Sequence, residues 1–324
     1  MSKEIKKVLV IKLGALGDFV LALAAMKKIR EAHPRAKITL LTTPPFEALA
    51  KLSPYFNTVE TDGRPGDFGD LTAMLGRLRK ARYDRVYDLQ TNSRSNWYFQ
   101  ALRPFPPQWS GIATGCALPQ RGKARYHMHT LERQADQLKQ AGIWPDAPTE
   151  PGSAPPPDLT WILRRTKAPR GPVAGATAAK PYVLLVPGGS AHRPEKRWPV
   201  ESYAQLAALL KARGLDIVII GGPQESAMAR QIQKAVGQAR DLTGRTDFAQ
   251  LAVLGAKAAL AIGNDTGPTH LLAAAGAPTI ALFSDASDPE LCGPRGHVAV
   301  IRSPDLKALP VSTVASAAIS LLPH

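Results

Sequence analysis

The sequence predicts an α/β protein in which two doubly wound domains face a shared cleft. Two strand–turn–helix junctions, one in each half of the chain, carry a carboxylate at the start of the helix: residues 8–18 with Asp18, and residues 260–270 with Asp265. Short apolar runs alternate with helical patterns in both halves, which favours parallel sheets covered by helices. Such sheets bind ligands at the carboxyl ends of their strands, so one junction per half predicts a site between two domains.

The first half alternates strands and helices from its beginning. Short apolar runs predict strands at 7–11, 37–41, 58–60 and 85–89. Amphipathic periodicity predicts helices at 18–32, 45–52, 67–81, 94–102 and 130–141.

A proline-rich segment separates the two halves. Nine of the 29 prolines lie between Pro145 and Pro181, and residues 171–181 have the composition of a flexible linker. We therefore predict an N-terminal domain at 1–165, a linker at 166–181 and a C-terminal domain at 182–324.

The second half repeats the plan of the first. Strands are predicted at 182–186, 215–220, 258–262 and 279–283, and helices at 201–213, from 224, from 266 and at 311–322. The last helix consists mostly of Ala, Ser and Leu, a composition suited to packing back on the N-terminal domain.

Composition excludes several classes of protein. The 324 residues are 44% hydrophobic and 21% charged, which suits a soluble protein with real cores, and two cysteines cannot form a disulfide framework. Lysines followed by an apolar run make residues 3–25 similar to a signal peptide, but Lys12 and Asp18 interrupt the run. No apolar stretch is long enough for a transmembrane helix, so we expect a cytoplasmic protein.

Positive charge is concentrated in the first half. Residues 1–170 hold 27 Lys and Arg against 15 Asp and Glu, whereas residues 171–324 hold 14 against 11. This excess suits a polyanionic partner such as nucleic acid, an anionic membrane or a phosphorylated substrate; the alternative is charge for solubility. Trp and Tyr do not interleave with the basic clusters, so we expect no nucleic-acid partner.

Asp18 follows the glycine turn of the first junction. A carboxylate at the mouth of a parallel sheet is placed to act as a general base toward an acceptor hydroxyl. The alternative is a plain helix N-cap. The turn, with Gly14 and Gly17, lacks the Gly-x-Gly-x-x-Gly fingerprint, so it predicts no dinucleotide site.

The loop at 187–199 combines a glycine turn with cations. Gly189 and Ser190 allow the backbone to approach a phosphate, and Lys196 and Arg197 supply positive charge. The loop is not a P-loop. The alternative is a solvated basic loop.

The second junction and the segment after residue 220 complete the candidate donor site. Asp265, Thr266 and Gly267 open a helix whose free N–H groups suit a diphosphate, although Asp265 is alternatively only a cap and His270 only a core histidine. Glu225 lies just beyond a strand, where a carboxylate binds ribose hydroxyls or merely opens a helix. Two weaker clusters lie at 88–94 and 121–133.

The ordered motifs resemble glycosyltransferase family 9, whose best-known members are the ADP-heptose:lipopolysaccharide heptosyltransferases. The matching segments are 12–18, 187–190, 196–199, 222–225, 265–270, 288–289 and 293–294. The resemblance implies a GT-B fold, with two Rossmann-like domains and a central cleft. Residues 283–287 and 192–195 depart from the family pattern.

The resemblance also implies residue roles. Asp18 would be the general base and Lys196 would neutralise the diphosphate. Donor-binding residues would be Gly189, Ser190, His192, Arg197, Glu225, Asp265, Thr266, Gly267 and His270. Acceptor-binding residues would be Gly14, Gly17, Asp88, Asn92, Arg94 and His129. We predict no metal site, because the cleft segments lack an Asp-x-Asp motif, and no tightly bound cofactor.

The predicted function is inverting transfer of a heptose from a nucleotide-diphosphate donor, ADP-heptose by the resemblance, to a lipid A–core acceptor. The protein would be cytoplasmic and peripherally attached to the inner membrane, because the basic half suits an anionic surface. The alternatives are a related transferase that uses another donor, such as a UDP-hexose, and a catalytically silent module that binds anionic glycans.

Overall fold

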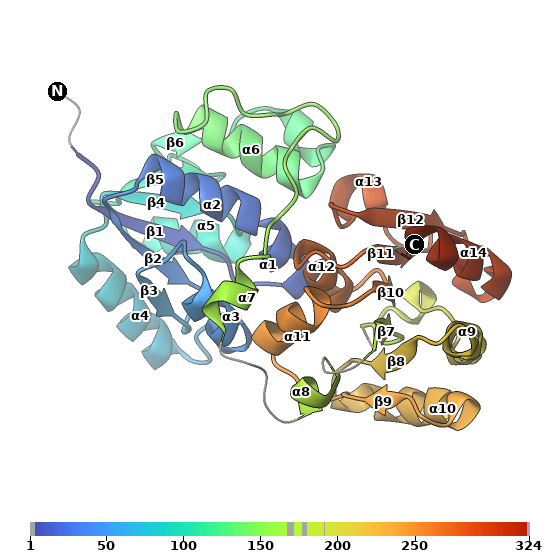
Figure 1. Cartoon of the computed structure of the whole chain (residues 1–324). Helices are drawn as coiled ribbons and strands as arrows, with labels where there is room; N and C mark the ends of the chain where they lie inside the picture. Colours follow the sequence, from blue (N-terminus) through green and yellow to red (C-terminus); the bar gives the residue numbers. More distant parts are fainter. Residues whose placement is uncertain (1–3, 167–171, 177–179, 191, 323–324) are drawn as a thin grey trace. The chain divides into compact units, whose positions relative to one another are not determined.

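Two parallel six-stranded sheets, each wound by helices, form the computed structural model of the chain (Figure 1). The structure describes residues 4–166, 172–176, 180–190 and 192–322. The chain divides into two compact units, Met1–Pro156 and Pro157–His324. The predicted α/β class with two doubly wound domains is confirmed.

The sheet of the first unit has the strand order β3-β2-β1-β4-β5-β6. Its strands are β1 (Lys7–Ile11), β2 (Lys37–Leu41), β3 (Thr58–Glu60), β4 (Arg85–Asp88), β5 (Gln108–Gly111) and β6 (Leu118–Pro119). In β1 and β2 every residue after the first is buried, which is why both appear in the sequence as continuous apolar runs. β5 and β6 were not predicted, since Gln108–Gly111 contains no such run.

The helices of the first unit follow the predicted order. They are α1 (Leu16–Leu21), α2 (Leu23–Ala32), α3 (Glu47–Leu52), α4 (Phe68–Ala81), α5 (Ser93–Ala101) and α6 (Thr130–Gln140), with short 3-10 turns η1 (Pro44–Phe46) and η2 (Lys123–Tyr126). The predicted helix 18–32 is two helices that meet at Ala22. Residues of α4 and α5 pack on Leu9, Ile11 and Val86 to form one face of the core.

The second unit has the strand order β12-β11-β10-β7-β8-β9. Its strands are β7 (Tyr182–Val186), β8 (Asp216–Ile219), β9 (Arg240–Asp241), β10 (Leu260–Asn264), β11 (Thr279–Phe283) and β12 (Val298–Arg302). Read from its own first strand, this is the same order as in the first unit. In both sheets the winding direction reverses beside the first strand, between β1 and β4 and between β7 and β10, and ligands of doubly wound folds bind at this point.

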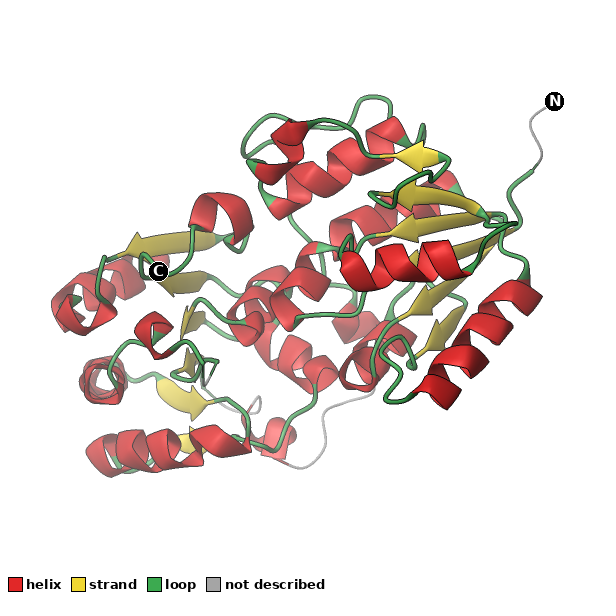
Figure 2. Ribbon diagram, turned by 180° about the vertical axis from the view of Figure 1, so that it is seen from behind, coloured by secondary structure: helices red, strands yellow, loops and turns green. Residues whose placement is uncertain are grey.

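The second unit carries more short helices than the first. They are α7 (Ile162–Arg165), α8 (Pro172–Ala176), α9 (Val200–Ala212), α10 (Ser226–Val236), α11 (Phe248–Gly255), α12 (Gly267–Ala274), α13 (Pro289–Cys292) and α14 (Val311–Leu321), with 3-10 turns η3 (Pro194–Lys196), η4 (Pro223–Glu225) and η5 (Leu306–Ala308). Figure 2 shows helices on both faces of each sheet. α7, α8, α11 and α13 were not predicted.

The second unit begins at Pro157, before the predicted end of the N-terminal domain at 165. The division falls after Pro156, and the Leu159 N–H donates to the Ala274 carbonyl at 2.8 Å, while Leu159 and Ile162 are buried. Of the predicted linker 166–181, residues 167–171 and 177–179 lie outside the described residues, and α8 lies between these gaps.

The last helix, α14, packs one side on the core of its own unit. Val314 and Ala318 join the core formed by α9, α10 and one face of the second sheet. Packing of the same helix on the N-terminal domain stays a prediction. Among the described residues, no helix combines the length and the apolar character needed to cross a membrane.

Candidate active site

Each unit has a pocket where its winding direction reverses. In the first unit, a cavity of about 280 Å³ lies at the ends of β1 and β4. Its lining consists of Lys12, Asp18, Leu89, Gln90, Thr91, Arg125, Tyr126, Arg133, Gln134 and Gln137. The second unit has a comparable pocket, described below.

Asp18 lines the first pocket and does not cap its helix. α1 begins at Leu16, its N-cap residue is Ala15, and no side chain of this helix makes the cap hydrogen bond. Asp18 is thus the third residue of α1, half-buried, and the alternative of a plain N-cap is wrong. Gly14 shapes the turn before it: its φ is +109°, and a Cβ there would lie 3.0 Å from the Phe46 ring.

Lys12 is a buried cation in the same pocket. Its Nζ donates to the Leu89 carbonyl at 3.2 Å, and burial lowers the pKa of Lys12 while the nearby Asp18 carboxylate opposes that shift. Lys12 is not among the site residues that the sequence predicts, because the apolar run ahead of it indicates only a strand. The feature of the sequence that could have identified Lys12 is its place directly after a buried strand.

Two arginines add to the charge of the first pocket. The Arg125 Nε donates to Gln120 Oε1 at 3.1 Å, and its guanidinium lies over the Tyr126 ring. Arg133, on α6, donates to Thr130 Oγ1. Three cations and one carboxylate therefore surround the cavity, an environment that suits an anionic ligand.

The four weaker acceptor-side predictions make local contacts, and none of them is in the lining of this pocket among the described residues. Asp88 is fully buried, and its Oδ1 accepts hydrogen bonds from the Gln90 and Thr91 N–H groups, both at 3.0 Å. Burial raises the pKa of Asp88 to about 6. Asp88 thus holds the backbone of two residues that line the pocket.

Asn92 and His129 also make local capping contacts. Asn92 forms a capping box with Ser95 at the start of α5. The buried His129 caps α6, its Nδ1 accepting from the Leu131 N–H at 3.1 Å. Arg94 is exposed on α5, and Gly17 lies in the first turn of α1.

The second pocket, about 290 Å³, lies at the ends of β7 and β10. It is lined by Val186, Gly188, Gly189, Ser190, Gly221, Gly222, Gln224, Glu225, Thr266, Gly267 and Pro268. Thr266 is the N-cap residue of α12, so the positive end of that helix faces the pocket. Predicted donor residues from three separate loops meet here.

Glu225 lies against the glycine turn. It is buried, its Oε2 accepts from the Gly222 N–H at 2.6 Å, and a Cβ on Gly188 would lie 2.5 Å from its Cγ. Gly188 therefore has to be glycine for this carboxylate to reach the pocket. Glu225 therefore both accepts a hydrogen bond at the start of η4 and lines the pocket, so the two alternatives for this residue do not exclude each other.

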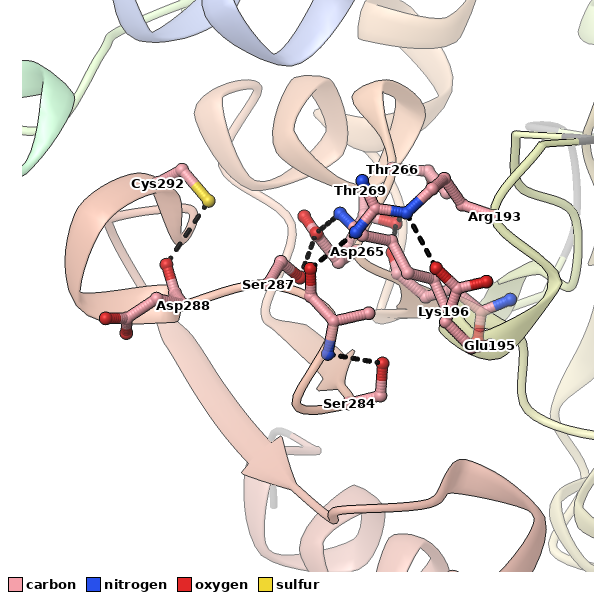
Figure 3. A network of polar contacts seen from close by, with 12 residues as sticks. Arg193, Glu195, Lys196, Asp265, Thr266, Thr269, Ser284, Ser287, Asp288 and Cys292 are labelled. Atoms are coloured by element: carbon pink, nitrogen blue, oxygen red, sulfur yellow. Dashed lines mark hydrogen bonds and ion pairs between the residues drawn. The ribbon is translucent and has the colours of Figure 1, made fainter.

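Lys196 and Asp265 form an ion pair beside the start of α12. The Lys196 Nζ lies 2.7 Å from Asp265 Oδ2, and Ser287 Oγ donates to the same oxygen at 2.6 Å (Figure 3). His270 Nε2 is 3.5 Å from Asp265 Oδ1. Burial would raise the pKa of Asp265, but the hydrogen bonds from His270, Lys196 and Ser287 outweigh it and hold the pKa well below its usual range. Asp265 is thus ionised, and the buried His270 stabilises its carboxylate.

Asn264 ties the second site together. Its Nδ2 donates to the Pro187 and Gly188 carbonyls, both at 3.0 Å, and its Oδ1 accepts from the Trp198 N–H at 3.0 Å and the Tyr203 hydroxyl at 3.1 Å. The fully buried amide therefore joins the glycine turn to the segment that carries Lys196 and Arg197. Asn264 is missing from the predicted site residues, because the strand was predicted to end at 262 and no motif marks the asparagine that follows.

The remaining donor predictions differ in position. Arg197 Nη2 donates to the Gly189 carbonyl at 2.6 Å, which fixes the glycine turn. Ser190 lines the pocket, whereas His192 is exposed and outside its lining. No group of three or more His, Cys, Asp or Glu side chains is arranged to hold a metal ion within the described ranges.

Comparison with known proteins identifies the family. The model of glycosyltransferase family 9 (heptosyltransferase) matches residues 71–316. The chain belongs to glycosyltransferase family 9. It is a glycosyltransferase, and the resemblance drawn from the ordered motifs is confirmed.

Curated relatives and solved structures agree with this family. Lipopolysaccharide heptosyltransferase 2 of Escherichia coli (strain K12) is 28% identical over 322 residues, covering 91% of this chain and 88% of the relative. The family 9 glycosyl transferase of Veillonella parvula has a TM-score of 0.82 at 21% identity, covering 98% of both chains. The structure of E. coli ADP-heptose LPS heptosyltransferase II has a TM-score of 0.80 at 22% identity, covering 97% of this chain and 98% of that one. These likenesses confirm the GT-B type of fold.

Proposed function

We propose that this family 9 glycosyltransferase transfers a heptose from ADP-heptose to an anionic acceptor of the lipopolysaccharide inner core, with inversion at the anomeric carbon. The observation that carries the proposal is the second-unit pocket, where the start of α12, Glu225 and the glycine turn meet close to Lys196. The donor and acceptor are those in the names of the similar proteins.

The donor would bind the second unit. The N–H groups at the start of α12 and the Lys196 ammonium would stabilise the negative charge that grows on the departing diphosphate. The Glu225 carboxylate would accept hydrogen bonds from the ribose hydroxyls. Lys196 would reach the diphosphate from its present contact with Asp265.

The acceptor would bind the first unit. Lys12, Arg125 and Arg133 would hold its anionic groups, and Asp18 would take the proton from the attacking hydroxyl. The hydroxyl would attack the anomeric carbon from the face opposite the leaving diphosphate. The reaction requires that the donor's anomeric carbon come within reach of Asp18 in the catalytic complex.

The deciding experiment is a donor and acceptor screen with the purified full chain. We expect ADP release and a heptosylated product with ADP-heptose and a truncated lipid A–core acceptor, and no product with UDP-hexoses. Turnover with a UDP-hexose and not with ADP-heptose would show that the donor is a hexose nucleotide. Binding of the acceptor without turnover of any nucleotide-sugar would favour the catalytically silent module.

We also propose that the protein works in the cytoplasm, attached peripherally to an anionic membrane surface. The excess of cations in residues 1–170 supports this, since each basic side chain near an anionic surface adds about 1 kcal/mol of attraction. Vesicles with anionic lipid should bind the protein at low salt and release it at high salt. Equal binding to neutral and anionic vesicles would contradict the proposal.

A further inference from the structure

The two segments that depart from the family pattern contact each other in the second unit. Arg193, in the segment 192–195, donates from Nη2 to the Ala286 carbonyl at 2.6 Å, and Ala286 belongs to the segment 283–287. The two segments come from loops after different strands, β7 and β11. Both lie beside the Lys196–Asp265 ion pair (Figure 3).

The loop after β11 is held by its own hydrogen bonds and by Arg193. The Ala286 N–H donates to Ser284 Oγ and the Ser287 N–H to the Ser284 carbonyl, both at 3.3 Å. Arg193 holds the Ala286 carbonyl from the other side, with its guanidinium oriented by Glu195 through a 2.7 Å contact. The next residue, Ser287, is thereby placed with its hydroxyl on Asp265.

Asp265 Oδ2 therefore accepts from two donors of different kinds. Lys196 Nζ is charged and lies 2.7 Å away, and Ser287 Oγ is neutral and lies 2.6 Å away. A diphosphate at the start of α12 would compete with Asp265 for the lysine. If the lysine turned toward the diphosphate, Asp265 would keep the Ser287 hydroxyl on Oδ2 and His270 beside Oδ1, which lowers the cost of losing the lysine from a largely buried carboxylate.

We propose that Arg193 and Ser287 are positioning residues of the donor site. Arg193 acts through the Ala286 carbonyl on Ser287, and Ser287 acts through Asp265 on Lys196. The inference rests on the proposed function, in which the second-unit pocket binds a nucleoside diphosphate-sugar. It assigns the two departing segments a common role in setting how readily Lys196 is shared with the diphosphate.

The test uses four single variants of the full chain: Arg193→Met, Arg193→Lys, Ser287→Ala and Ser287→Thr. We expect Arg193→Met and Ser287→Ala each to raise the donor KM and the Kd for ADP by about 3- to 10-fold, the typical loss for one hydrogen bond. The kcat should change less than the KM. Ser287→Thr keeps the hydroxyl and should have the wild-type KM. The KM of Arg193→Lys should lie between those of the wild type and Arg193→Met.

A double-mutant cycle shows whether Arg193 and Ser287 affect ADP binding through one chain of contacts or independently of each other. If Arg193 acts through Ser287, the double variant Arg193→Met with Ser287→Ala should be no worse than the weaker-binding single variant. Arg302→Met is the matched control: Arg302 binds the Asp285 side chain of the same loop through an exposed pair at 3.2 Å, and its removal should leave ADP binding within twofold.

Three results would overturn the inference while leaving the proposed function intact. They are additive effects of the two substitutions, an unchanged ADP Kd in Ser287→Ala, and an equal loss in Ser287→Ala and Ser287→Thr. Absence of ADP and UDP binding by the wild-type chain, measured by calorimetry, would instead overturn the proposed function on which the inference rests.

Discussion

Lys196 Nζ lies 2.7 Å from Asp265 Oδ2, so the lysine proposed to bind the donor diphosphate is already paired with a carboxylate. Both side chains are largely buried, so taking one partner away leaves the other charge in need of compensation. Donor binding then amounts to an exchange of partners at the Lys196 ammonium.

Replacing Lys196 should cost rate and binding together. We expect Lys196→Ala to lower kcat on the order of 100-fold or more, because a cation aimed at the leaving group is lost, and to raise the Kd for ADP. Lys211→Ala is the matched control, since Lys211 forms a more exposed ion pair with Asp216 in the same unit. An equal loss of turnover in both variants would contradict the role of Lys196.

Asp18→Asn should separate chemistry from stability. Because Asp18 does not cap α1, we expect a melting temperature within a few degrees of wild type, unchanged ADP binding and a turnover lower by about 100- to 10,000-fold. Asp67→Ala is the contrasting variant: Asp67 caps α4 with a 2.8 Å hydrogen bond, and its loss should cost about 1 kcal/mol of stability without affecting turnover. Full turnover in Asp18→Asn would rule out the general-base role.

Asp88 should give the first unit a measurable pH dependence. Burial raises the pKa of Asp88 to about 6, above its ordinary value of 3.8, so the folded state prefers the protonated form. The stabilisation is complete below about pH 4 and is lost as the pH rises through about 6. Relative to Asp88→Asn, the wild-type free energy of unfolding should fall by about 2–3 kcal/mol between pH 4 and pH 8, measured by denaturant titration. Parallel profiles for the two proteins would disprove this assignment.

Asn264→Asp should damage the donor site through its supports. The carboxylate keeps the acceptor role toward Trp198 and Tyr203 but loses the donors to the Pro187 and Gly188 carbonyls, so it places negative charge against two carbonyl oxygens. We expect a loss of stability of about 2 kcal/mol or more, and weaker ADP binding. Tyr203→Phe removes one hydrogen bond to the same amide and should leave ADP binding nearly unchanged. Equal ADP affinity in wild type and Asn264→Asp would show that the amide has no part in shaping the site.

Much of the fold could be predicted because buried parallel strands appear as apolar runs. The bounds of β1, β2, β3, β7 and β11 agree with prediction. β10 was predicted at 258–262 but spans Leu260–Asn264, because the polar Asn264 is buried by four side-chain hydrogen bonds that hydrophobicity does not reveal. The edge strands β6 and β9 were missed, since each has only two residues. The edge strand β12 was also missed, although it has five residues.

The sequence predicts which loops carry the site residues, because these loops follow strand ends. It does not predict which contacts their side chains make. Thr266, Gly267 and Glu225 reach one pocket as their motifs indicate. Asp88 and His129 were selected as polar residues near a strand end or in a basic cluster, and the structure uses both for local backbone hydrogen bonds. Residue type and spacing alone do not distinguish a carboxylate that faces a pocket from one that closes a turn.

The sequence alone determined the α/β class, the two-domain plan, the family and the loops that carry the chemistry, because hydrophobic periodicity and glycine turns are local properties of the chain. Only the tertiary structure decided which side chains meet: Lys12 beside Asp18, Ser287 and Lys196 on one oxygen of Asp265, and Arg193 on Ala286. Those contacts join residues brought together by strand order, and strand order follows from how whole elements pack rather than from any local pattern.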